Sequence, residues 1–145
     1  MKDSLKQGLS YEFNFTVPES KTVPHLFPEA PQFQQMPRVL ATGFLVGLIE
    51  WTCIQAVNPH IDWPREQTVG TQISIIHTAA TPPECHVTVN VRLTALEGRK
   101  LTFDFEADDG IDSICKGTHE RFVIDAEKFA AKLDMKIKQA GEQSP

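Results

Sequence analysis

The chain has 145 residues, a formal net charge of −5 at pH 7 and a sequence pI of about 5.5. This length fits one domain with a hydrophobic core, and the acidic balance gives no basic footprint for nucleic acid. The three cysteines are scattered without a Cys-x-x-Cys pair, which argues against a disulfide framework or a zinc site and predicts reduced thiols in a cytoplasmic protein. The first eight residues contain no apolar run, so we expect no secretory signal.

Two segments precede the most apolar part of the chain. Residues 10–17 alternate apolar and polar side chains, which predicts a half-buried strand. Residues 21–37 contain four prolines and no periodicity, yet they carry several apolar side chains. We expect this segment to be ordered, as a lid if it is functional and as a cover for the core if it is not.

Residues 41–58 are apolar around nearly the whole circumference of a helix, which predicts a buried central helix. Pro59 ends it because proline lacks the N–H that helix continuation needs. A single carboxylate, Glu50, lies in the middle. A buried charge is costly unless it is paired, and such a group often has a shifted pKa and a function. Glu50 and the short length also argue against a membrane span, so no membrane partner is expected.

The second half of the chain predicts four strands and a helix. In the strand expected over 70–81, His77 shares a face with two isoleucines and points toward the core. A histidine in such a place is usually a core residue, but this core must also hold Glu50. Asp125 can cap the last helix, which has an apolar stripe. The remaining predicted elements are strands at 85–96, 101–107 and 113–124, a turn at 97–99 that makes the first two a hairpin, and the helix at 125–140.

An antiparallel sheet wrapped around one apolar helix is the simplest way to bury that helix. We therefore predict an α+β hot-dog fold for a single domain over 1–145, with a lid-like segment at 23–37. Exposed strand edges are hidden by pairing, so a homodimer with a continuous sheet is expected. The histidines at 25, 60 and 86 show no metal-ligand spacing, and we predict no metal site.

Several stretches of the sequence closely resemble the fluoroacetyl-CoA thioesterase family of hot-dog proteins, over about residues 8–132. Runs of seven and five matching residues begin at His77 and Gly117. The matching stretches are 21–23, 41–44, 46–48, 50–51, 70–71, 77–83, 97–99, 109–110 with 112, 117–121 and 127–129.

The resemblance implies hydrolysis of a short acyl-CoA, with fluoroacetyl-CoA as the leading substrate and fluoroacetate resistance as the setting. CoA is part of the substrate, so no further cofactor is expected. The implied catalytic residues are Thr42, Glu50 and His77, and the implied substrate-binding residues are Gly70, Arg121, Val23, Phe33 and Met36, the last three in an aromatic lid over the acyl pocket.

These residues suit thioester hydrolysis. Glu50 would attack the carbonyl or activate water, His77 would hydrogen-bond Glu50 and carry the proton, and Thr42 would position the nucleophile or polarise the carbonyl. The Gly70 N–H would complete an oxyanion hole. However, Thr42 and Glu50 lie about 12 Å apart along one straight helix. Either the chain bends back at Thr42, or one residue comes from a partner protomer.

Three residues leave alternatives open. The family's characterised enzyme has phenylalanine where Met36 stands, and a flexible methionine would gate the pocket less rigidly, which favours a broader acyl range. Arg121 is either a substrate contact or the ionic partner of Glu50. His119 lies beside it on the last strand and is expected to be solvated. A non-catalytic acyl-CoA binding protein is the remaining alternative, although binding alone needs no buried carboxylate.

Overall fold

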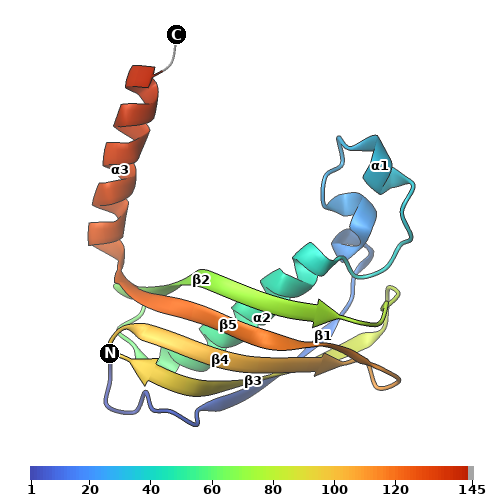
Figure 1. The fold of residues 1–145 in the computed structure, drawn as a ribbon, viewed down its shortest axis with the longest axis horizontal. Coiled ribbons are helices and arrows are strands. Elements are labelled where there is room, and N and C mark those ends of the chain that lie inside the picture. The colour runs from blue at the N-terminus through green and yellow to red at the C-terminus, as the bar shows by residue number, and fades with distance from the viewer. Residues whose placement is uncertain (144–145) are drawn as a thin grey trace.

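In the computed structural model, which describes residues 1–143, a five-stranded antiparallel sheet packs against helix α2 (Figure 1). The spatial order of the strands is β1-β3-β4-β5-β2, so β1 and β2 are the two edges. This confirms the predicted α+β architecture. The strands are β1 (Ser10–Thr16), β2 (Glu66–His77), β3 (His86–Glu97), β4 (Lys100–Asp108) and β5 (Ser113–Asp125). The helices are α1 (Pro31–Gln34), α2 (Thr42–Val57) and α3 (Ala126–Gln143), with 3-10 turns η1 (Glu19–Lys21), η2 (Val23–His25) and η3 (Asn58–His60).

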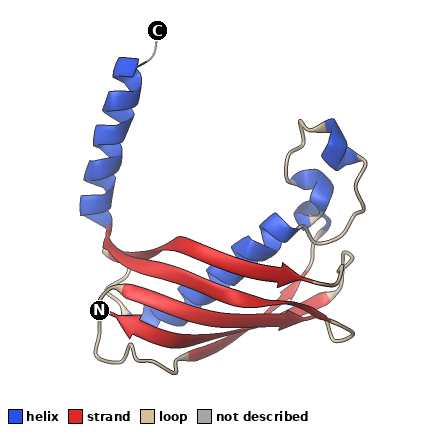
Figure 2. Ribbon diagram, in the orientation of Figure 1, coloured by secondary structure: helices blue, strands red, loops and turns tan. Residues whose placement is uncertain are grey.

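The core lies between the sheet and one side of α2 (Figure 2). Alternation along β3 and β4 turns every second side chain toward the helix, and these side chains are buried, as predicted. From α2 they meet Leu45, Ile49 and Cys53. The prediction that α2 is buried on nearly all sides is wrong for the single chain, because a single sheet covers only one side of the helix. Gly43, Gly47 and Trp51 remain exposed.

Strand β2 spans 66–77 instead of the predicted 70–81. Its early start follows from pairing with β5, in which Glu66 lies opposite Asp125 at the far end of the sheet. A local sequence pattern does not contain this tertiary pairing. The register shifts between Gly70 and Gln72, which marks a β-bulge beside the edge of the sheet.

The segment before α2 is ordered, as expected from its apolar content. The rings of Phe27 and Phe33 stack with centroids 5.7 Å apart. The side-chain amide of Gln34 donates a hydrogen bond of 2.8 Å to the Pro24 carbonyl, which ties α1 to η2. The segment projects beyond β2 at the end of the strand where His77 lies (Figure 1).

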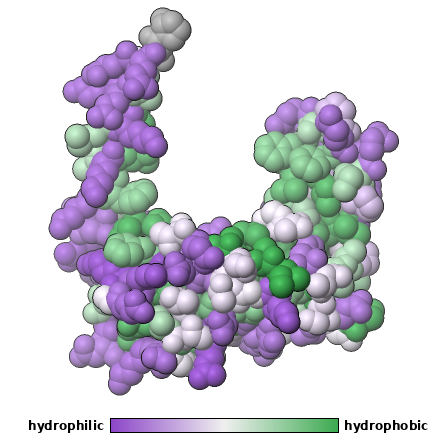
Figure 3. Space-filling view, in the orientation of Figure 1, coloured by the Kyte–Doolittle hydropathy of each residue, from purple (hydrophilic) through white to green (hydrophobic). Residues whose placement is uncertain are grey.

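Helix α3 projects beyond the opposite end of β2 (Figures 1 and 3). The Asp125 carboxylate accepts a hydrogen bond of 3.1 Å from the Lys128 N–H, which confirms the predicted N-cap. The helix runs through Gly141 to Gln143, further than the predicted 140. Its apolar stripe is exposed, with Leu133 at 49%. No helix among residues 1–143 is long and apolar enough to cross a membrane.

Candidate active site

The first part of the site joins the start of α2 to the end of β2. Thr42 is the first residue of α2, after the N-cap Ala41, and His77 is the last residue of β2. Thr42 Oγ1 and His77 Nδ1 lie 2.9 Å apart. The other ring nitrogen, Nε2, is buried without a hydrogen-bond partner among residues 1–143. A buried ring nitrogen of this kind is suited to a further polar partner.

The second part is an ion pair between α2 and β5. Arg121 Nη1 donates a hydrogen bond of 2.9 Å to Glu50 Oε2. The Arg121 side chain is 3% exposed and the Glu50 side chain 39% exposed. Thr68 on β2 fixes the guanidinium from the other side, through its hydroxyl at 2.9 Å and its carbonyl at 2.8 Å. Arg121 is therefore the ionic partner of Glu50, one of the two alternatives that the sequence left open.

Gly70 forms the wall against which the Glu50 carboxylate lies. A Cβ atom built on Gly70 would come within 2.6 Å of Glu50 Oε2 and 3.3 Å of Arg121 Nη1. Any side chain at Gly70 would therefore displace the carboxylate. The close approach of a carboxylate to a β-strand backbone explains why glycine stands at this point of β2.

His119 belongs to this second part, and the expectation that it is solvated is wrong. It is 2% exposed, because it lies two residues from Arg121 and a strand places such residues on the same face. Its Nε2 lies 3.1 Å from Arg121 Nη1 and its Nδ1 lies 2.8 Å from the Gln72 carbonyl. Burial lowers the pKa of His119 below its ordinary value. The signal in the sequence was the spacing of two residues between His119 and Arg121, which places both side chains on the same face of the strand.

The two parts do not meet within one chain. The predicted hydrogen bond between His77 and Glu50 is absent among the described residues, because His77 Nδ1 pairs with Thr42 and Glu50 pairs with Arg121. Helix α2 is continuous from Thr42 to Val57, so the chain does not bend back at Thr42. The rise of an α-helix then separates Thr42 and Glu50 by about 12 Å along its axis.

The predicted lid residues lie beside the Thr42 end of α2. Leu26 approaches the first turn of the helix so closely that a Cβ on Gly43 would lie 3.0 Å from its Cδ2 atom. Val23 and Phe33 are half-buried in this segment, whereas Met36 is 49% exposed. An apolar cavity of about 300 Å³ lies along α2 beside the lid segment, and Phe44 and Trp51 are among the side chains that line it.

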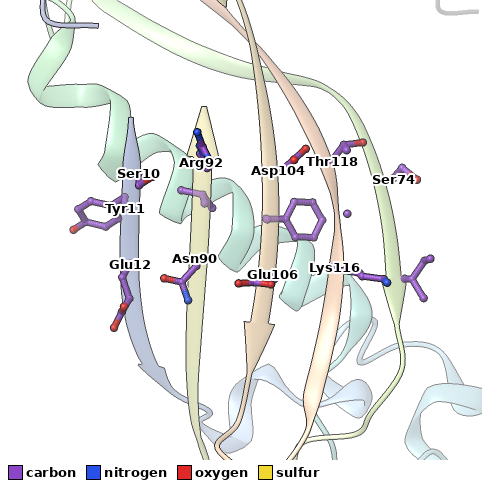
Figure 4. Close-up of a pocket in the computed structure, with 14 residues that line it drawn as sticks. Ser10, Tyr11, Glu12, Ser74, Asn90, Arg92, Asp104, Glu106, Lys116 and Thr118 are labelled. Atoms are coloured by element: carbon purple, nitrogen blue, oxygen red, sulfur yellow. The ribbon is translucent and has the colours of Figure 1, made fainter. Parts of the chain in front are cut away.

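A larger hollow of about 910 Å³ lies on the face of the sheet turned away from α2 (Figure 4). It is lined by side chains of both charges, among them Glu12, Arg92 and Lys116, and by none of the predicted site residues. Residues 1–143 contain no group of three His, Cys, Asp or Glu side chains placed to hold a metal ion.

The sequence pattern of the fluoroacetyl-CoA-specific thioesterase family matches residues 19–127. The chain belongs to this family. The fluoroacetyl-CoA thioesterase of Streptantibioticus cattleyicolor is 50% identical over 136 residues, which cover 94% of this chain and 97% of the relative. A solved structure of the fluoroacetyl-CoA thioesterase FlK is 46% identical and has a TM-score of 0.88, covering 99% of this chain and 100% of its own.

Membership of the fluoroacetyl-CoA-specific thioesterase family confirms the resemblance read from the sequence. A second solved structure, a mutant of the family's FlK enzyme in complex with fluoroacetate and CoA, is 50% identical with a TM-score of 0.83 and covers 86% of this chain and 99% of its own. A thioesterase superfamily member from Thermus thermophilus, 24% identical with a TM-score of 0.82 over 98% of this chain and 99% of its own, shares the fold. The hot-dog fold is thereby confirmed.

Proposed function

We propose that this protein hydrolyses fluoroacetyl-CoA to fluoroacetate and CoA. The observation that carries the proposal is the Glu50 carboxylate, which Arg121 holds at 2.9 Å against the open backbone of Gly70. A carboxylate fixed beside a strand backbone is placed to attack a carbonyl whose oxygen points to the N–H groups of that strand. The choice of the fluoroacetyl group follows from the 50% identical relative, which is a fluoroacetyl-CoA thioesterase.

We propose that the complete site forms between two protomers. Strand β2 is an edge strand, and both parts of the site lie along it, with Gly70 beside Glu50 and His77, at the end of the strand, beside Thr42. A two-fold axis across the free edge of β2 reverses the partner's strand. It brings the Glu50 part of one protomer toward the Thr42 part of the other. This pairing also hides the free N–H and C=O groups of the edge.

In this site Glu50 either removes a proton from an attacking water or attacks the thioester carbonyl itself. The direct attack breaks the C–S bond, expels the CoA thiolate and leaves an anhydride, which water then hydrolyses to regenerate Glu50. The Gly70 N–H stabilises the oxygen as negative charge develops on it. Thr42 positions the nucleophile or polarises the carbonyl, and its bond to His77 Nδ1 fixes the direction of the hydroxyl. His77 Nε2 relays to the leaving CoA thiolate the proton that the attacking water gives up, so the net reaction consumes one water and releases the free acid and CoA.

We propose that residues 23–37 act as a lid over the acyl group, with Val23, Phe33 and Met36 facing it. The stack of Phe33 on Phe27 makes part of the segment rigid. Met36 is 49% exposed and is an unbranched, flexible side chain. This favours a second candidate function, in which the same hydrolysis extends to a broader range of short and medium acyl groups.

The test is steady-state hydrolysis of fluoroacetyl-CoA, acetyl-CoA and longer acyl-CoAs by the purified protein and its Glu50→Ala variant. A large preference for fluoroacetyl-CoA that the variant loses supports the proposal. Comparable turnover of all thioesters supports the broader enzyme. If the protein binds acyl-CoA and hydrolyses none, the proposal is wrong and a non-catalytic acyl-CoA binding protein takes its place. If Glu50→Gln retains full turnover, the proposed role of Glu50 in the chemistry is wrong.

A further inference from the structure

The Arg121 guanidinium shares one of its nitrogens between two acceptors. Nη1 lies 2.9 Å from Glu50 Oε2 and 3.1 Å from His119 Nε2. Arg121 and His119 are both 2% exposed, so water does not replace the contact between them. Because Nη1 carries two hydrogens, each acceptor takes one, and the two contacts together fix the direction in which the guanidinium points.

The hydrogen bonds around His119 determine its tautomer. Nδ1 lies 2.8 Å from the Gln72 carbonyl, and a carbonyl oxygen only accepts, so Nδ1 carries the hydrogen. A neutral imidazole has a single N–H, which leaves the Nε2 lone pair free to accept from Arg121. Arginine is always protonated in proteins, so it is the donor. The two neighbours therefore require the same neutral form of His119.

The charges that face His119 come from two elements. Burial is the main cause of its lowered pKa, and the Arg121 cation acts in the same direction. The Gln72 carbonyl, Glu50 and Glu120 act in the opposite direction and are outweighed. Strand β5 contributes Arg121 and Glu120, α2 contributes Glu50, and β2 contributes the uncharged Gly70 and Gln72.

We propose that His119 is a positioning residue, which aims Arg121 and through it the Glu50 carboxylate, and that protonation of His119 switches the site off. The inference rests on the proposed hydrolysis. An imidazolium carries a hydrogen on Nε2 as well, which would face the Arg121 N–H with no acceptor between them. Arg121 would then have to turn away, and Glu50 would lose the cation that orients it.

The packing at Gly70 couples these groups closely. A Cβ built there would meet Glu50 Oε2 at 2.6 Å, Arg121 Nη1 at 3.3 Å and His119 Cε1 at 3.3 Å. All three groups therefore line the same side of one glycine. A shift of the imidazole therefore reaches the carboxylate through Arg121 Nη1, which contacts both groups.

The first test is the tautomer of His119 in the wild-type protein, read from long-range ¹H–¹⁵N correlations of the imidazole and assigned with the His119→Gln variant. We expect hydrogen on Nδ1 at neutral pH. Hydrogen on Nε2, or an imidazolium, would overturn the proposal whatever the activity of the protein. This measurement therefore remains decisive if the proposed hydrolysis fails.

The second test compares two variants. His119→Phe removes the acceptor, and we expect kcat to fall by about 10-fold or more with KM nearly unchanged, because a misplacement of about 1 Å can cost about 100-fold in rate. His119→Gln keeps an acceptor that does not titrate, so it retains most of kcat, and the acid limb of its pH profile moves to lower pH. The control is Thr52→Val, which removes a different buried hydrogen bond, the one of 2.7 Å from the Thr52 hydroxyl to the Leu48 carbonyl within α2.

Two results would contradict the positioning role. If His119→Gln and His119→Phe lose kcat equally, an acceptor at this place is not what matters. If the acid limb is the same in the wild type and in His119→Gln, protonation of His119 does not control the site. Should His119→Phe fail to fold, the pH profile of His119→Gln and the tautomer still decide the question.

Discussion

Gly70→Ala tests the central contact of the site with one methyl group. The new Cβ would lie 2.6 Å from Glu50 Oε2, whereas ordinary contact begins at 3.4 Å. The carboxylate must therefore move by about 0.8 Å, the difference between these distances. A misplacement of about 1 Å can cost 100-fold in rate, and overpacking typically costs about 1–3 kcal/mol of stability. The 39% exposure of Glu50 gives its side chain room to move, so we expect the lower end of the stability range.

We expect kcat for acyl-CoA hydrolysis to fall by about 10–100-fold in Gly70→Ala, while the protein stays folded. Steady-state kinetics and thermal unfolding measure the two effects on the same sample. Gly141→Ala is the matched control, because a Cβ at Gly141 meets nothing within 4 Å and alanine suits a helix better than glycine. Full activity in Gly70→Ala would refute the reasoning, since the carboxylate would then work equally well from a displaced position.

Three further predictions concern the lid, the last helix and the pH dependence of stability. Met36→Phe stiffens the lid, so we expect the ratio of kcat/KM for fluoroacetyl-CoA over longer acyl-CoAs to rise; an unchanged ratio would remove Met36 from the account of selectivity. Leu133→Glu on the exposed stripe of α3 is expected to lower the dimer fraction in sedimentation experiments, whereas Met135→Glu on its opposite face leaves it unchanged. Equal effects would show that the stripe is not in the interface. The hydrogen bond from the amino terminus is the main cause that lowers the pKa of Glu66 below 4.5. The stabilisation from this hydrogen bond is present above the pKa of Glu66 in the unfolded chain and is lost as the pH falls through the pKa of Glu66 in the folded protein. In urea unfolding, the free energy of unfolding of Glu66→Gln should therefore fall less over that acidic range than that of the wild type.

Local patterns in the sequence determined most of the fold. Alternation in 85–96 and 101–107 gave two strands with the correct inward faces, since a period of two is a property of the strand itself. The apolar run at 41–58 and Pro59 placed the central helix within a residue of its observed ends, and Asp125 marked the start of α3. The same patterns drew attention to Glu50, because a lone carboxylate in an apolar run is costly without a partner.

The partners in the site were decided by tertiary structure alone. The first four residues of β2 exist as strand because β5 pairs with them, and that pairing brings Thr68 to Arg121. Arg121 reaches Glu50 across 71 residues of sequence, a distance over which no periodic pattern carries information. His119 is buried because its strand face turns toward α2. The sequence thus supplied the chemical groups, while the packing of α2 on the sheet determined that Glu50 pairs with Arg121 and that Thr42 pairs with His77.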